Sequence, residues 1–424
     1  MLKTLKIPTS ELDFGMFVSA LDRDWLETPF VTQGFLIEAQ EDLDRVREIC
    51  EYVYIDSRRG RALNPSVKLT SIGPTEKTAA TKNAVKDRPR VPLERIFGGR
   101  IIQSYRDDSN WEDEHPRAQH ALNILVDDID HIFSQVHEGE KLNVIKLRKS
   151  VDPIVDSISR NPDACIWVTR LKKHDQYTYK HSLSAAIWSI SLGRQIGLQR
   201  QDLRSLAMGC MLMDVGKLRV NPELLQADRD LTSDETAEVA GHVRHGLAIL
   251  EECGILNQDV IDMVAHHHER YDGSGYPLGL MRDEIPPFAR IAAIVDTYDA
   301  ITSNRDYAPA VSPTDAIKIL YKARDEDFQA ELVESFIQAI GLYPAGTLVE
   351  LSSGEVGVVV AEYRTRRLRP KIMLLLDAQK NRLPESRVID LQELEENPDT
   401  PLVSIRRSLE PEAYDIDLSA IGLP

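Results

Sequence analysis

Cysteine is scarce in this chain, and its placement does not suggest a disulfide framework. The four cysteines stand in hydrophobic stretches without any C-x-x-C pair: Cys50, Cys165, Cys210 and Cys253. This arrangement predicts reduced, buried thiols of the kind found in cytoplasmic proteins.

Long apolar runs and an excess of positive charge are also lacking. No run approaches the roughly 20 apolar residues of a membrane span, and the N-terminal stretch MLKTLKIPTSELDFGM has no apolar core long enough for a signal peptide. Lys and Arg total 51 against 68 Asp and Glu, so the net charge is −17. Because binding long nucleic acids requires neutralised phosphates, we expect no such partner, although a small anion held by metals and a few basic residues remains compatible. We expect a cytoplasmic protein with no membrane insertion.

The first part of the chain is predicted to be a small α+β domain. The length of 424 residues is enough for two or three domains. Residues 1–65 contain strand-like runs at Leu5–Ile7 and Tyr52–Asp56, and helical spacing of apolar residues between Ala39 and Cys50.

The rest of the chain divides by composition and periodicity into four further segments. Residues 66–110 are a predicted linker. Its first part, to about residue 92, is poor in large apolar residues and is either a solvated tether or a contact for an acidic partner. Residues 111–341 show helical periodicity almost throughout. Residues 342–395 are β-rich and separated by turn residues, which predicts a small β appendage, and residues 396–424 are a predicted loose tail. The fold class is therefore mainly α.

The most distinctive segment is HHERYDGSGYP, from His267 to Pro277. Adjacent imidazoles near carboxylates are ligands for transition metals. Gly273 and Gly275 allow a backbone to come close to a ligand. The segment therefore predicts a metal beside a docking surface, provided that other helices supply more ligands.

The helical segment offers such ligands on or at the ends of predicted helices: His181, Asp214, His242 and Asp296. Helix bundles build metal sites from inward-facing side chains of this kind. Taken singly, each has an ordinary explanation, such as a hydrogen-bonded histidine or a helix cap. Asp296 stands in an apolar helix and needs a partner, which is either a metal or an arginine. The joint occurrence of the four favours a metal site.

Two hydrolase classes fit poorly. A zincin H-E-x-x-H motif beginning at His268 would need histidine where Asp272 stands. No G-x-S-x-G motif is present, and Ser274 has no sign of a neighbouring base.

The order of motifs resembles that of an HD-GYP domain, the cyclic di-GMP phosphodiesterase branch of the HD metal-hydrolase superfamily. The resemblance covers about residues 170 to 340 and rests on these motifs: His181, Asp214–Lys217, His242–Gly246, His267–Pro277 and Ala289–Tyr307. The first 65 residues, with Gly15–Val18 and Trp25, resemble a small uncharacterised domain that often precedes HD-GYP domains.

The resemblance implies a centre of two divalent transition metals, typically iron or manganese. It implies that Asp214 bridges the metals and acts in catalysis, that one metal is held by His242, His267 and His268, and that the other is held by His181 and Asp296. It also implies that Lys217 points at the scissile phosphate, and that Tyr276 and Arg305 line the nucleotide site. Cyclic di-GMP is the implied substrate, with linear pGpG and GMP as products, and the N-terminal domain is an implied surface for protein partners.

Three residues depart from the family pattern. Met213 stands where the family's name-giving motif has histidine, and a thioether is a poor donor to a hard ion. Tyr177 stands where some members carry a glutamate for a third metal, which favours two metals at most. Ala308 replaces a basic residue, which weakens one phosphate contact.

Met213 leaves several interpretations open. In one interpretation the first metal is bound more weakly and the site still hydrolyses its substrate. In the other the first metal site is empty and the protein is a non-catalytic binding module for cyclic di-GMP or a partner. His174 and His245 are candidates to replace the missing imidazole, and Glu269 either orients a ligand imidazole or is structural. A scaffold without metal is a third hypothesis, which the metal content of the purified protein distinguishes.

Overall fold

The computed structural model describes residues 4–22, 28, 35–37, 40–56, 91–171, 177–255, 257–303, 310–362, 368–396, 403–411 and 413–418. The chain divides into two compact units, Met1–Arg90 and Val91–Pro424. The predicted linker residues from 66 to 90, and Trp25, lie outside the described residues.

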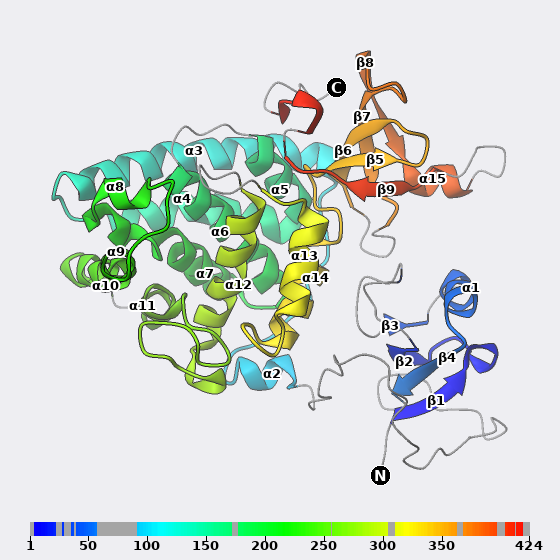
Figure 1. The fold of residues 1–424 in the computed structure, drawn as a ribbon, viewed down its shortest axis with the longest axis horizontal. Coiled ribbons are helices and arrows are strands. Elements are labelled where there is room, and N and C mark those ends of the chain that lie inside the picture. The colour runs from blue at the N-terminus through cyan, green and yellow to red at the C-terminus, as the bar shows by residue number, and fades with distance from the viewer. Residues whose placement is uncertain are drawn as a thin grey trace. The chain divides into compact units, whose positions relative to one another are not determined.

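The N-terminal unit is a small antiparallel sheet with one helix (Figure 1). Its strands are ordered β1-β4-β2-β3. Alternating residues such as Ile7, Val18 and Val53 are fully or almost fully buried, together with Val46 of the helix. The predicted α+β class is confirmed, with these bounds: β1 (Thr4–Pro8), η1 (Thr9–Glu11), β2 (Phe17–Leu21), β3 (Phe35–Leu36), α1 (Gln40–Ile49) and β4 (Tyr52–Asp56).

The second unit begins with helices that run from Leu93 to Ile340, and the mainly α class is confirmed. Their bounds are α2 (Leu93–Ile96), α3 (Trp111–His137), α4 (Val144–Arg160), α5 (Pro162–Leu171), α6 (Tyr177–Ile196), α7 (Arg200–Leu212), η3 (Val215–Arg219), α8 (Pro222–Leu225), α9 (Ser233–Ala240), α10 (His242–Glu252), α11 (Gln258–His266), η4 (Arg282–Glu284), α12 (Pro287–Thr302), α13 (Pro313–Lys322) and α14 (Ala330–Ile340).

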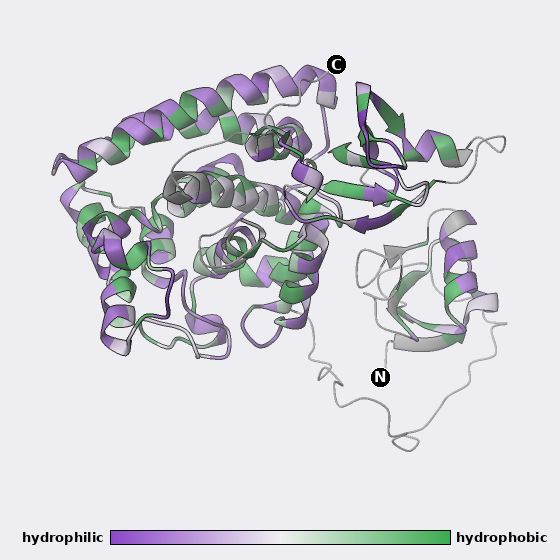
Figure 2. Ribbon diagram, turned by 45° about the horizontal axis from the view of Figure 1, so that its top comes forward, coloured by the Kyte–Doolittle hydropathy of each residue, from purple (hydrophilic) through white to green (hydrophobic). Residues whose placement is uncertain are grey.

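The long helix α3 covers one side of the bundle with an amphipathic surface. Its buried residues recur three and four positions apart, as in Ala118, Leu122, Leu125 and Ile129. Figure 2 shows the resulting alternation of hydrophobic and hydrophilic residues along this helix. Its N-cap is Asn110, whose side chain accepts the backbone N–H of Asp113.

The central helix α6 is buried nearly all round and packs against α7, α12 and α14. Its serines are compatible with this burial because their hydroxyls bond to the helix's own backbone: Ser189 donates to Ala186 O and Ser191 to Ile187 O. The helices that carry the predicted ligands are therefore set in a rigid core.

The C-terminal part of this unit is a five-stranded antiparallel sheet of order β8-β7-β6-β5-β9 (Figure 1). Its elements are β5 (Leu348–Leu351), β6 (Val356–Ala361), β7 (Lys371–Leu376), β8 (Arg382–Asp390), α15 (Leu391–Glu396), β9 (Ile405–Ser408) and η5 (Ala413–Asp415). The predicted loose tail from residue 396 is wrong for Ile405–Ser408, because this segment pairs with β5 as an edge strand.

The predicted linker boundary at residue 110 also needs correction. Ile96 and Phe97 are buried, and the guanidinium of Arg100 pairs with Asp202 and Asp259. Residues 91–110 therefore belong to the helical unit, since two apolar side chains and a cation anchor them there.

The four cysteines form no disulfide, as predicted. Cys50, Cys165 and Cys210 are buried. Cys253 follows the last turn of α10 and is only partly buried. Its sulfur accepts the backbone N–H of Leu142.

Candidate metal centre

Asp214 is brought to the site by a turn that has no room for a side chain. It follows α7 and precedes η3. At Gly216, in that turn, an added Cβ would overlap the carbonyl oxygen of His242 and the amide nitrogen of Gly246. Because only glycine fits this approach, the turn packs directly on the start of α10, and Asp214 lies beside His242.

Four predicted ligands meet in one buried cluster. Ligand atoms of Asp214, His242, His267 and His268 all lie within 4.8 Å of one another. Asp214 Oδ1 is 3.5 Å from His242 Nε2 and 3.7 Å from His267 Nε2. The two Nε2 atoms are 3.3 Å apart. Their helices are held together because α10 packs on α11 and α11 on α7.

The backbone selects the tautomers of two of these imidazoles. Nδ1 of His242 donates to Val239 O at 2.8 Å, and Nδ1 of His267 lies 3.1 Å from Met263 O and Val264 O. With the proton on Nδ1, the lone pair of each Nε2 faces the other and Asp214. This is the arrangement that a histidine needs in order to bind a metal.

Burial also sets the protonation states that a metal requires. Burial lowers the pKa of His242 to about 4, against the opposing effect of Asp214. Burial and the neighbouring His267 hold the pKa of His268 well below its usual range. Burial tends to raise the pKa of Asp214, but Lys217 and the surrounding imidazoles outweigh it and lower that pKa well below its usual value. Near neutral pH His242 and His268 are therefore neutral imidazoles and Asp214 is a carboxylate.

These residues fit a bound cation. Asp214 Oδ1 is buried and has no hydrogen-bond partner, and an orphaned buried carboxylate oxygen is costly. Two nitrogen lone pairs also face each other beside it. A divalent ion would satisfy all three atoms at once, and such an N/O donor set is typical of transition-metal sites.

A second half of the site lies across Asp214. Nε2 of His181, at the buried start of α6, is 2.9 Å from Asp296 Oδ1 and 3.8 Å from Asp214 Oδ2. Asp296 Oδ2 is in turn 3.9 Å from Nδ1 of His268. The six ligands predicted from the sequence are thus brought together, with the two oxygens of Asp214 facing different imidazoles.

Asp299 completes this half and was missed by the sequence analysis. Its Oδ2 is 2.8 Å from Nδ1 of His181, and its Oδ1 accepts the indole N–H of Trp188 at 3.3 Å. Burial disfavours a charged His181, but hydrogen bonds to Asp296 and Asp299 outweigh burial and raise its pKa to about 10. His181 is therefore protonated near neutral pH, and a metal held at Nε2 would take the place of its proton. A signal was available, since Asp299 follows Asp296 by three residues on one helix and shares its face.

Glu269 organises the Gly-Tyr-Pro loop and contacts no ligand imidazole at hydrogen-bond distance. Its buried carboxylate accepts the backbone N–H groups of Leu278 at 2.8 Å and Leu280 at 3.0 Å. This supports the structural alternative for Glu269. At Gly275 an added Cβ would overlap the backbone of the preceding turn, so the glycine serves the loop's own packing.

The loop places Tyr276 over the cluster. Its ring stacks on His268 with centroids 4.6 Å apart, and 37% of the residue is exposed. Burial, with the charges of Asp214 and Asp296, raises the pKa of Tyr276. The phenol is therefore neutral and forms part of the wall between the cluster and solvent.

The remaining candidates are placed as follows. Lys217 Nζ donates to Asp214 Oδ2 at 2.6 Å, and its side chain is 26% exposed. Met213 is fully buried at the C-terminal end of α7, next to Asp214 in the chain. His245 is not part of the four-residue cluster. Arg305, His174, Ala308 and the side chain of Tyr177 lie outside the described residues.

The fold and the site define a class of protein, a helical domain with a buried His/Asp cluster that could bind metal. Family models agree along the chain: "HD domain" matches residues 167–332, "Domain of unknown function (DUF3391)" matches residues 4–146, and "KOW domain associated with HD domain" matches residues 348–414.

The chain belongs to the HD-GYP family of metal-dependent phosphodiesterases. It is 33% identical over 391 residues to the "Cyclic di-GMP phosphodiesterase PA4108" of Pseudomonas aeruginosa. The matched region covers 91% of this chain and 88% of that protein. It is 35% identical over 148 residues to the "Cyclic di-GMP phosphodiesterase response regulator RpfG" of Xanthomonas campestris. That matched region covers 35% of this chain and 39% of that protein.

One solved structure is also similar, the HDG"Y"P protein Bd1817 of Bdellovibrio bacteriovorus. It has a TM-score of 0.45 and 17% identity, and the match covers 78% of this chain and 98% of that one. Among the helices that the structure describes, none is long and apolar enough to cross a membrane.

Proposed function

We propose that this protein hydrolyses cyclic di-GMP to linear pGpG, with GMP as the product of a second cleavage. The observation that carries the proposal is the buried cluster around Asp214, which lies beneath the Gly-Tyr-Pro loop. The names of the relatives supply the substrate, because the full-length match is a cyclic di-GMP phosphodiesterase.

Two divalent metals, iron or manganese, would be held by the six ligands. His242, His267 and His268 would serve one metal, His181 and Asp296 the other, and Asp214 would bridge them. When bound, such a pair lowers the pKa of a shared water and neutralises phosphate oxygens. The mixed N/O donor set suits iron or manganese better than a soft metal.

The chain's own residues then hold the substrate. The ammonium of Lys217 contacts Asp214 and is partly open to solvent, so it is placed to donate to a phosphate oxygen where negative charge develops. Tyr276 presents an aromatic face next to His268, which suits a guanine base or the ribose that carries it. Arg305 remains a predicted residue of the nucleotide site, and the N-terminal unit remains a predicted surface for protein partners.

A second candidate function is that of a non-catalytic cyclic di-GMP-binding or partner-binding module. The observation that favours it is Met213, because a buried thioether stands where the family motif has a metal-binding imidazole. The two functions differ in turnover and share the binding of the nucleotide.

Nucleotide chromatography after incubation with iron or manganese, under reducing and anaerobic conditions, tests the proposal. We expect pGpG to form in at least one of the two metals, and the isolated protein to carry transition metal. If cyclic di-GMP binds but no product forms with either metal, hydrolysis is rejected and the binding module remains as the function. Absence of metal even after reconstitution would reject both in favour of a scaffold.

Replacing Met213 by histidine tests directly whether the missing imidazole limits the metal site. Because imidazole is a better donor than a thioether to these metals, Met213→His is expected to raise metal affinity or the rate of hydrolysis by about tenfold, the scale on which supporting groups affect metal sites. Met213→Leu is the matched control, since it keeps an apolar side chain of similar size and should change neither value. An unchanged or lower value in Met213→His would show that the site is built around methionine.

A further inference from the structure

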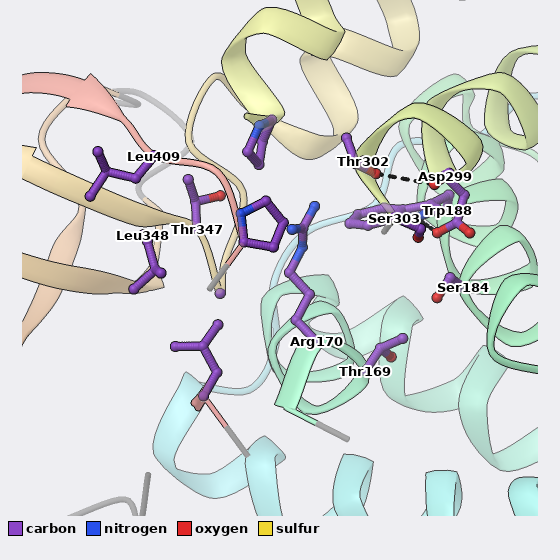
Figure 3. Close-up of a pocket in the computed structure, with 14 residues that line it drawn as sticks. Thr169, Arg170, Ser184, Trp188, Asp299, Thr302, Ser303, Thr347, Leu348 and Leu409 are labelled. Atoms are coloured by element: carbon purple, nitrogen blue, oxygen red, sulfur yellow. Dashed lines mark hydrogen bonds between the residues drawn. The ribbon is translucent and has the colours of Figure 1, made fainter. Parts of the chain in front are cut away.

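A cavity lies where α5, α6 and α12 meet the strands β5 and β9, and Asp299, which contacts His181, is part of its lining. Its volume is about 160 Å³, and none of the six proposed metal ligands lines it. Figure 3 shows Arg170 reaching into the space between Thr347 and Leu348 on one side and Trp188 and Ser303 on the other. The cavity is therefore built by both the helical bundle and the C-terminal sheet.

Arg170 brings a positive charge that forms no ion pair with the described residues. The carboxylate of Asp299 also lines the cavity, but it is engaged by His181 and Trp188. Its guanidinium stacks over the Trp188 ring at 5.5 Å and donates one long hydrogen bond, 3.4 Å, to the hydroxyl of Tyr298. Its Nε is buried without any hydrogen-bond partner. The residue as a whole is half-buried, but a buried N–H without an acceptor is costly, so this nitrogen favours a ligand that supplies one.

The position of Arg170 is fixed by the turn before β5. At Gly346, where φ is +84°, an added Cβ would lie 2.7 Å from Cδ of Arg170. The aliphatic part of the side chain is therefore packed against the backbone of the sheet. A guanidinium held in place loses little conformational entropy when it binds a ligand.

Thr347 supplies a second unsatisfied group in the same cavity. The residue is 1% exposed, and its hydroxyl has no hydrogen-bond partner. A hydroxyl donor and a guanidinium N–H in one cavity match the oxygens of a carboxylate or another oxyanion.

The rest of the lining selects among oxyanions. An apolar wall is formed by Trp188, Pro313, Leu348, Leu409, Pro411 and Leu418, while Thr169, Ser184, Thr302 and Ser303 line the remainder. Inorganic phosphate leaves such a wall uncovered, whereas an organic acid covers it. A cavity of roughly 150 Å³ holds a benzene ring, so an acid of about six to nine heavy atoms fits a space of this size that opens to solvent.

We propose that this cavity is an effector site for a small monocarboxylate with an apolar body, and that its occupation strengthens metal binding at the His/Asp centre. The binding stands on the cavity alone. Its effect on the metal rests on the proposed function of that centre.

A short chain of contacts connects the two sites. Trp188 stacks under Arg170 and donates its indole N–H to Asp299, and Asp299 holds Nδ1 of His181. A carboxylate beside Arg170 offsets a positive charge near this chain. The potential at His181 becomes more negative, which favours a cation at its other nitrogen.

Benzoate is the probe for the binding step, measured by isothermal titration calorimetry on the full-length, metal-free protein. Benzyl alcohol has a similar shape without the charge, and inorganic phosphate has the charge without the apolar body. We expect one benzoate per chain, with both comparison compounds at least about tenfold weaker, because hydrogen bonds to charged groups contribute on that scale.

Variants assign the binding to named residues. Arg170→Gln should weaken benzoate by about tenfold or more and Thr347→Val by about fivefold, while Arg148→Gln, which removes an exposed charge from α4, should have no effect. Circular dichroism and thermal unfolding check that each variant is folded. The site would be overturned if Arg170→Gln bound benzoate as tightly as the unmodified protein. It would also be overturned if benzyl alcohol bound as tightly as benzoate, or if phosphate bound and benzoate did not.

The coupling is measured by titrating Mn²⁺ with and without saturating benzoate. We expect Mn²⁺ to bind about fivefold more tightly with benzoate, and benzoate to gain the same factor in the Mn²⁺-loaded protein, since linkage is reciprocal. Benzoate binding without any change in Mn²⁺ affinity would overturn the effector role. A benzoate-dependent Mn²⁺ affinity in a protein that leaves cyclic di-GMP intact would refute the proposed hydrolysis and leave the effector site standing.

Discussion

Replacing Asp214 by alanine is expected to remove bound metal and to abolish hydrolysis of cyclic di-GMP. The two oxygens of this carboxylate face different imidazoles, 3.5 Å from His242 and 3.8 Å from His181. The substitution removes the negative charge shared by both halves, and each proposed metal loses one of its ligands. The rate should fall by more than the roughly 10²–10³-fold that follows loss of a single transition-state donor.

Metal analysis of the protein purified without oxygen, together with product chromatography, measures this effect. Asp214→Asn is a second variant that keeps the shape of the side chain, so loss of metal there cannot be attributed to a cavity. Asp228→Ala removes an exposed carboxylate from the same part of the chain and should change neither metal nor rate. Two metals retained in Asp214→Ala would refute its role as the bridge.

Replacing Gly216 by alanine is expected to damage the same site through the backbone. The added methyl group would overlap the carbonyl of His242 and the amide of Gly246, so the turn must move away from α10. Overpacking of this kind costs about 1–3 kcal/mol of stability. It should also separate Asp214 from His242 and lower the metal content.

Urea unfolding and metal analysis of Gly216→Ala measure the two consequences. Gly98→Ala is the matched control, because an added Cβ there meets one atom at 3.6 Å, an ordinary contact. Lower stability with normal metal content would show that the turn relaxes without moving Asp214. Unchanged stability would contradict the close packing of the turn on α10.

Much of the metal centre was predictable from the sequence because its ligands keep a recognisable order along the chain. His181, Asp214, His242, His267, His268 and Asp296 each stand beside a helix of clear periodicity. Each was weak evidence alone, since isolated histidines and aspartates have ordinary structural roles. The structure brings them together, while their binding of metal stays a prediction.

The roles of Asp299 and Glu269 were harder to predict. Asp299 lies in the same helix as Asp296, yet its contact is with an imidazole 118 residues earlier in the chain. Glu269 is adjacent to the ligand pair and was equally compatible with a role toward an imidazole. It accepts instead from backbone groups nine and eleven residues later, a choice that depends on the path of the loop.

The C-terminal segment shows the same limit for secondary structure. Ile405–Ser408 has little strand signal of its own, and it becomes β9 because β5 offers an unpaired edge. Local patterns were sufficient for β5, β6 and β7, whose apolar residues are buried on both faces.

The sequence by itself determined the mainly α class, the small α+β unit at the N-terminus and the set of residues able to bind metal, because periodicity and residue chemistry are local properties. Only the tertiary structure decided which oxygen faces which imidazole, that Asp299 supports His181, and that Arg170 lines a cavity without forming an ion pair to any residue the structure describes. Those features depend on distances between elements far apart in the chain, and the packing of the helices and the sheet sets these distances.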